Sequence, residues 1–134
     1  MDWKLEVVPI PVSDIDKAKE FYSERLGFVV DHDTQISPDT RVVQLTPPGS
    51  ACSVVIGVDT GSAPGSLKGL QIVVPDIDAA RAQLDERGVE VGTVKHYTED
   101  GRLAEGKGGP WNSFVFFNDL DGNSWILQER PAGE

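Results

Sequence analysis

This 134-residue chain has two histidines, His32 and His96, and one cysteine, Cys52, which are residue types suited to metal, acid-base or thiol chemistry. His32 lies between two aspartates, and imidazole and carboxylate groups can chelate a metal, but adjacent residues of a strand point to opposite faces. His96 precedes a glycine-rich segment and could act over a pocket as an acid, a base or a hydrogen-bonding group; the alternative is a solvated loop residue. Cys52 has no base or cation beside it in the sequence, so we interpret it as a packing residue.

Two amides and one tryptophan favour binding over catalysis. Gln71 and Gln128 lie in otherwise apolar, strand-like segments. A buried amide without partners costs about 1–3 kcal/mol, so each should contact a ligand, a water molecule or the other amide. Trp111 ends the glycine-rich segment 97–110, which we predict to be an irregular, flexible lid, and its ring is free to cover a ligand.

The elements that must position these residues are revealed by an internal repeat. Residues 12–25 recur at 74–87, and seven of the fourteen positions are identical. A period of this length indicates a duplicated supersecondary module. In each copy an aspartate, Asp14 or Asp76, precedes an apolar stripe of helical spacing, and a glycine follows it, as expected for a capped helix. The first copy is one residue longer at the helix end.

Strand-like segments surround both helices, so the repeat predicts two βαβββ modules with eight strands in all. We place module one at about residues 4–58 and module two at about 67–130, within one domain of residues 1–134. The sixth strand is expected to begin within residues 89–94. A small-residue linker, residues 59–66, joins the modules.

Composition excludes several function classes. A net charge of −10 repels phosphate backbones and anionic lipids, so nucleic acid and membrane surfaces are not expected partners, whereas a neutral or cationic small molecule is. No apolar run approaches the roughly 20 residues that span a bilayer, and the first residues lack the pattern of a secretory signal. The lone cysteine agrees with a reducing compartment, and we expect a cytoplasmic protein.

Four motifs give the chain a resemblance to the vicinal oxygen chelate superfamily, which holds glyoxalase I, bleomycin-resistance proteins and extradiol dioxygenases. They are Val12-x-Asp14, Phe21-Tyr-x-x-x-Leu-Gly-Phe28, Val74-x-Asp76 and Asp119-Leu-Asp-Gly-Asn123. The family usually has proline where Leu120 stands. The resemblance covers almost the whole chain. It implies an α+β fold in which two tandem βαβββ modules form a curved mixed sheet with a concave cavity, and it implies a homodimer.

The metal ligands that the resemblance implies are missing from their places. The family's first-strand histidines fall on Val7 and Gly69, its closing-strand glutamate falls on Ile126, and residues 54–57 hold no acidic side chain. Because first-row metals need imidazole, thiolate or carboxylate donors, we expect no metal and no cofactor at these places.

We therefore predict a small-molecule-binding protein that sequesters an apolar or cationic compound such as an antibiotic. The alternative is a glyoxalase-like or dioxygenase-like enzyme, a lyase, isomerase or oxidoreductase with a displaced or degenerate metal site. No catalytic residue is assigned. Strand alternation and the lid place the candidate binding residues in the cavity: Val7, Gly69, Gln71, His96, Trp111, Ile126 and Gln128.

Overall fold

Both helices begin at the predicted aspartates in the computed structural model, which describes residues 1–133. Helix α1 (Ile15–Glu20) is capped by Asp14, whose side chain accepts a hydrogen bond from the Lys17 backbone N–H. Helix α2 (Ile77–Glu86) is capped in the same way by Asp76. The two caps have φ values of −141° and −142°, so the sequence repeat is also a structural repeat.

The extra residue of the first copy is absorbed by a π-helical turn, η1 (Phe21–Arg25), directly after α1. In this turn Leu26 N–H donates to the Phe21 carbonyl, and Phe28 N–H donates to the Tyr22 carbonyl at 2.9 Å. At the end of α2, Val89 N–H donates to the Leu84 carbonyl, which lies one residue closer in sequence. A single widened turn is the usual form of the π-helix, and here it allows two consecutive aromatic side chains, Phe21 and Tyr22, to be buried.

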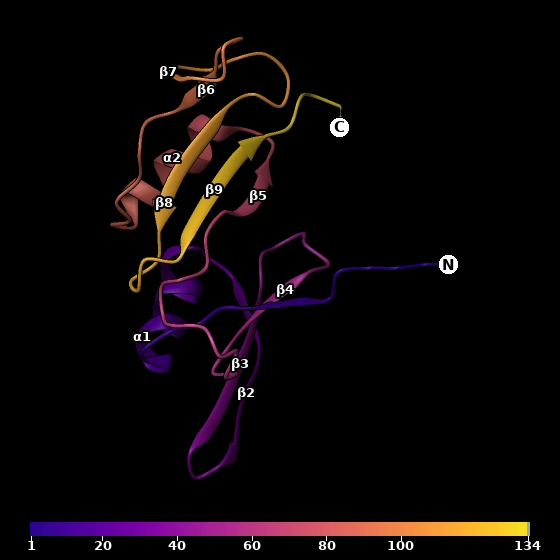
Figure 1. The fold of residues 1–134 in the computed structure, drawn as a ribbon, viewed down its shortest axis with the longest axis vertical. Coiled ribbons are helices and arrows are strands. Elements are labelled where there is room, and N and C mark those ends of the chain that lie inside the picture. Colours follow the sequence, from indigo (N-terminus) through magenta and orange to yellow (C-terminus); the bar gives the residue numbers. More distant parts are fainter. Residues whose placement is uncertain (134) are drawn as a thin grey trace. The chain divides into compact units, whose positions relative to one another are not determined.

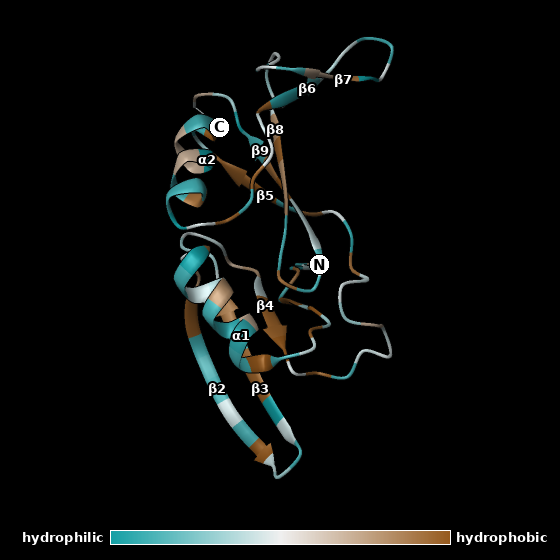
Figure 2. Cartoon of the chain, turned by 90° about the vertical axis from the view of Figure 1, so that its left-hand side faces the viewer, coloured by the Kyte–Doolittle hydropathy of each residue, from teal (hydrophilic) through white to brown (hydrophobic). Residues whose placement is uncertain are grey.

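The chain divides into two compact units, and the first comprises residues 1–67 and 119–123. Its sheet has the order β1-β4-β3-β2 (Figure 1). The strands are β1 (Val7–Pro9), β2 (Val29–Ser37), β3 (Thr40–Thr46) and β4 (Ser53–Ile56). Strand β1 pairs with β4 in parallel, and the other pairs are antiparallel. β2 is a largely hydrophilic edge strand (Figure 2), which disfavours pairing with other chains.

Alternation along the first sheet separates a core face from an open face. Val43, Leu45 and Ile56 are fully buried on the core face, where α1 packs against β3 and β4. Their neighbours Gln44, Thr46 and Val55 belong to the opposite face because successive side chains of a strand alternate.

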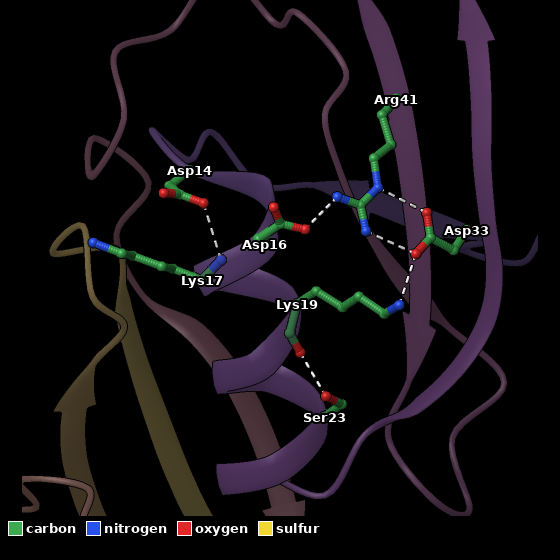
Figure 3. A network of polar contacts seen from close by, with 7 residues as sticks. All are labelled: Asp14, Asp16, Lys17, Lys19, Ser23, Asp33 and Arg41. Atoms are coloured by element: carbon green, nitrogen blue, oxygen red, sulfur yellow. Dashed lines mark hydrogen bonds and ion pairs between the residues drawn. The ribbon is translucent and has the colours of Figure 1, made fainter.

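An ion-pair network ties α1 to the β2–β3 hairpin on the core side of this sheet (Figure 3). The Asp33 carboxylate contacts Arg41 at 2.8 Å and Lys19 at 2.7 Å, and Arg41 also contacts Asp16. The hydrogen bonds from Arg41 and Lys19 hold the pKa of Asp33 far below its usual range. Exposed ion pairs add little stability each, so the network mainly fixes the orientation of the hairpin on the helix.

The motif at residues 119–123 is a structural clasp of the first unit. Asp119 accepts hydrogen bonds from the Tyr22 hydroxyl at 2.6 Å and from the Asn123 side chain at 2.8 Å. Asn123 also donates to the Pro11 carbonyl and accepts from the Leu67 backbone N–H. Asp121 accepts from both the backbone and the hydroxyl of Ser13. The polar side chains of the motif are therefore used to close this turn onto the first module.

The second unit contains residues 68–118 and the chain from Ser124 onward. Its sheet has the order β5-β9-β8-β6-β7. The strands are β5 (Leu70–Val74), β6 (Lys95–Tyr97), β7 (Leu103–Glu105), β8 (Phe114–Asn118) and β9 (Ser124–Glu129). On one face of this sheet the buried residues Val115, Phe117, Trp125 and Leu127 form the core, and α2 packs against β8 and β9.

The Glu129 side chain shows which side of the second sheet faces α2. Its carboxylate accepts a hydrogen bond from the Ile77 backbone N–H at the start of α2 and forms an ion pair with Lys107 at 3.0 Å. The hydrogen bond from the Ile77 N–H lowers the pKa of Glu129 most, and the interaction with Lys107 lowers it further. Glu129 therefore lies on the helix side of the sheet, and Gln128 lies on the opposite side.

Two strand predictions for module two were wrong. Residues 89–94 supply only one bridge, from Val91 to Phe117, and the sixth strand begins at Lys95. Residues 97–110, predicted to lack regular structure, contain β7 and a hairpin closed around Thr98 and Arg102. Residues 1–133 thus form nine strands instead of eight. Val89 is buried, and its N–H donates a hydrogen bond to the Leu84 carbonyl at the end of α2. Residue 89 therefore still belongs to the end of the helix, and strand β6 starts later in the sequence than predicted.

The tandem-module fold expected from the sequence is confirmed by the two mixed sheets, each with one helix. Within residues 1–133, none of the helices has the length and apolar character required to cross a membrane.

Candidate ligand-binding face

The sheet of the second unit carries a row of aromatic and apolar side chains on the face opposite α2. Register places Gln71 beside Ile126, and Phe116 opposite Ile126. Phe114 stacks on Phe116 with ring centroids 6.4 Å apart, and the Tyr97 ring meets Phe114 edge-on at 5.4 Å. We call this surface the aromatic face; it comprises Gln71, Val73, Tyr97, Phe114, Phe116, Ile126 and Gln128.

Gln71 and Gln128 form a relay of amides at one end of the aromatic face. The Gln71 side-chain NH₂ donates to the Gln128 carbonyl oxygen at 2.7 Å, and the Gln128 NH₂ donates to the Trp111 backbone carbonyl at 2.8 Å. The two amides therefore contact each other, one of the three alternatives expected from the sequence. The remaining N–H of each NH₂ group and the Gln71 oxygen can still bind a ligand.

Trp111 has an unusual backbone conformation. Its φ is +64°, and it is the one non-glycine residue with positive φ among residues 1–133. Such a conformation costs a residue with a side chain about 1–3 kcal/mol and persists only where the surroundings hold it. The hydrogen bond from Gln128 to its carbonyl is one such restraint, and Trp111 as a whole residue is 44% exposed. The fold thus maintains backbone strain at a large aromatic side chain that is accessible to solvent.

The segment before Trp111 is anchored, in contrast to the flexible lid expected from its glycines. The Asn112 side chain pairs with both the N–H and the carbonyl of Tyr97, each at 2.8 Å. A Cβ on Gly108 would lie 2.4 Å from the Asn112 carbonyl oxygen, so glycine is needed here for a close approach. These contacts make residues 106–112 a fixed support for Trp111.

His96 does not lie with the other candidates. Because Lys95 pairs with Phe114, alternation puts Lys95 and Tyr97 on the aromatic face and His96 on the other side of β6. The His96 Nδ1 atom lies 2.9 Å from the Gly106 carbonyl oxygen, so its ring helps to hold the anchored segment.

The remaining candidates divide between the two units. Gly69 has φ +81° and donates its N–H to Ser124 at the start of β9, next to the aromatic face. Val7 belongs to the first unit, where it pairs with Ser53. The structure thus brings Gln71, Trp111, Ile126 and Gln128 together in the second unit, and the role of every candidate in binding stays a prediction.

A metal does not fit the places where the resemblance would put one. Val7, Gly69 and Ile126 offer no donor side chain, and β4 consists of Ser53, two valines and Ile56. Across residues 1–133, no three His, Cys, Asp or Glu side chains gather in a way that could hold a metal ion.

Sequence reasoning missed the aromatic row. Tyr97, Phe114 and Phe116 were not among the candidates, although alternation in the segment 114–117 shows that one pair of its phenylalanines must face away from the helix. Tyr97 could not have been found in this way, because it lies in the segment predicted to be irregular.

Comparisons with known proteins agree with this picture. A family model described as the Glyoxalase/Bleomycin resistance protein/Dioxygenase superfamily matches residues 4–127. The chain is 27% identical over 128 residues to the uncharacterised protein YetH of Bacillus subtilis, with 94% of this chain and 98% of YetH covered. It is similar to the structure of TnmS3, an antibiotic binding protein from Streptomyces sp. CB03234, with 36% identity, a TM-score of 0.76 and coverage of 96% and 97%. A superfamily member from Sphaerobacter thermophilus shows 32% identity, a TM-score of 0.75 and coverage of 96% and 98%.

Proposed function

Because this chain belongs to the glyoxalase/bleomycin resistance protein/dioxygenase superfamily, we propose that it binds a flat, largely apolar small molecule of the antibiotic type on the aromatic face, without transforming it. The observation that carries the proposal is the strained, solvent-accessible Trp111 beside this face. The similarity to the antibiotic binding protein TnmS3 supports it independently.

The proposed binding mode follows from the chemistry of the face. Stacked and edge-on rings leave aromatic surface on which a planar ligand gains contact area, and aromatic pairs contribute about 0.5–1.5 kcal/mol beyond area burial. Binding pockets are mostly apolar with a few polar groups that set the orientation, and the Gln71–Gln128 relay supplies these. The side chains that define the face are aromatic, aliphatic or amide groups, which suit binding by sequestration.

Gln128 has a second role in this proposal as a positioning residue. Its amide holds the Trp111 carbonyl and thereby the backbone conformation that directs the indole. The ligand affinity lost on substitution of Gln128 thus includes the loss of an ordered Trp111.

Trp111→Ala is expected to weaken the binding of a planar aromatic ligand by about tenfold or more, because a stacked ring contributes roughly 1.4 kcal/mol or more through area burial and stacking. The measurement is a titration with acridone as the minimal probe, followed by a panel of fused-ring aromatic antibiotics, using tryptophan quenching and calorimetry.

Trp3→Ala is the matched control, because Trp3 is 82% exposed and belongs to the first unit. It should leave the affinity unchanged. Equal affinities for the wild type and Trp111→Ala, or equal losses in both variants, would place the ligand elsewhere than beside Trp111. If no compound of the panel binds, the proposed function is wrong.

A further inference from the structure

Three polar side chains form a row across the open face of the first unit's sheet. The Ser53 and Thr46 hydroxyls lie 2.6 Å apart on neighbouring strands, and the Thr46 hydroxyl donates to the Asp31 carboxylate on β2. Ser53 is buried, Thr46 is half-buried and Asp31 is exposed. The row therefore leads from the interior of the sheet to a carboxylate that solvent can reach.

The surroundings of this row are apolar. By register, Val7 lies beside Ser53, Val29 lies opposite Thr46, and Val55 belongs to the same face. Asp31 and Val29 are both exposed, so the row offers a solvent-accessible carboxylate beside an apolar surface.

Asp31 differs from the second aspartate of the same strand. A register shift between Val30 and His32 puts His32 opposite Gln44 on the open face and turns Asp33 to the core side. There Asp33 is neutralised by Lys19 and Arg41, whereas Asp31 has only the Thr46 hydroxyl as a partner within residues 1–133. β-Bulges commonly re-aim side chains at functional sites. The strand thus carries one satisfied carboxylate and one without a cation.

We propose that Asp31, oriented by Thr46 and Ser53, binds the ammonium group of a small organic cation whose apolar part rests on the neighbouring valines. The row is a poor site for a divalent metal, because Ca²⁺ requires six to eight oxygen ligands and this row supplies one charged group and two hydroxyls. The net charge of −10 attracts cations to the surface in general, and the row gives that attraction a specific position. This inference goes beyond the proposed function, because it concerns the other sheet and needs none of the aromatic face.

The test compares cyclohexylmethylammonium with the neutral cyclohexylmethanol, which has nearly the same shape. Their saturated rings cannot stack on the aromatic face as a planar ligand does. The cation is expected to bind at least tenfold more tightly than the alcohol and to shift the NMR signals of the His32 ring, which is in the open-face register beside the row. Asp31→Asn should lower the affinity for the cation by about tenfold and leave the affinity for the alcohol unchanged.

Asp33→Asn is the matched control. It removes the same charge two residues along β2, on the opposite face, and should leave the affinity for the cation within about twofold, with native circular dichroism confirming the fold. The inference is overturned if both asparagine variants lower the affinity for the cation equally, because that result would show a general charge effect. It is overturned as well if the wild type binds the alcohol as tightly as it binds the cation. It is also overturned if the His32 signals do not move.

Discussion

Asn123→Ala is expected to lower the free energy of unfolding by about 3–5 kcal/mol, an exceptionally large effect for one substitution. Asn123 is 0% exposed and connects three separate segments through the Pro11 carbonyl, the Leu67 N–H and the Asp119 carboxylate. Alanine would leave the Leu67 N–H without its partner and would remove one of the partners of the Pro11 carbonyl and of the Asp119 carboxylate. Each unsatisfied buried group costs about 1–3 kcal/mol.

Chemical denaturation followed by circular dichroism measures this effect. Leu120→Ala is the control in the same turn: its side chain is 63% exposed, and the change in stability should stay within about 0.5 kcal/mol. A loss below 1 kcal/mol for Asn123→Ala would show that the turn does not clasp the first unit.

Gly65→Ala should destabilise the protein by about 2–5 kcal/mol for a different reason. Gly65 has φ +83°, and a Cβ there would lie 2.0 Å from the Asp121 carbonyl oxygen, so the side chain meets backbone that belongs to the same clasp. The left-handed conformation alone costs alanine about 1–2 kcal/mol, and the collision adds about 1–3 kcal/mol.

Gly61→Ala separates these two contributions. Gly61 has a similar φ of +76°, but an added Cβ would meet no atom within 4 Å. Thermal unfolding of the two variants should therefore show a clearly larger loss for Gly65→Ala. Equal losses would mean that backbone strain accounts for the whole effect and that the loop does not approach Asp121 closely.

The sequence was most informative where local chemistry decides the structure. Asp14 and Asp76 cap their helices because a short carboxylate satisfies free N–H groups wherever a helix starts. Strand alternation alone was enough to predict on which side of the sheet Gln128 lies. The family was identified from motifs whose polar residues hold the fold together, and Tyr22, Asp119 and Asn123 show the contacts that those motifs supply.

The features missed by sequence reasoning depend on contacts between distant segments. The hairpin of β6 and β7 lies in a segment whose glycines suggested a lid, yet Asn112 and Gly108 fix that segment by close packing. The positive φ of Trp111 has no signal in the sequence, because tryptophan does not favour that conformation. The register shift that separates Asp31 from Asp33 is also set by pairing with β3 and not by the strand's own residues.

These missed features include those that support the proposed function. The candidates Gln71, Ile126 and Gln128 came from alternation, but the support for Trp111 and the row of Tyr97, Phe114 and Phe116 emerged only from the folded chain. A search for binding residues restricted to the family's metal places would have stopped at Val7, Gly69 and Ile126, which have no donor groups.

The most direct test of binding on the aromatic face is NMR mapping of the protein titrated with acridone, with isotope labels on side-chain amides, methyl groups and aromatic rings. We expect the largest changes at the side chains of Gln71, Phe116, Ile126 and Gln128 and at the Trp111 indole. Val115 and Leu127, on the same strands but buried against α2, should change little. Changes concentrated on the α2 side, or spread evenly over both faces, would contradict the account.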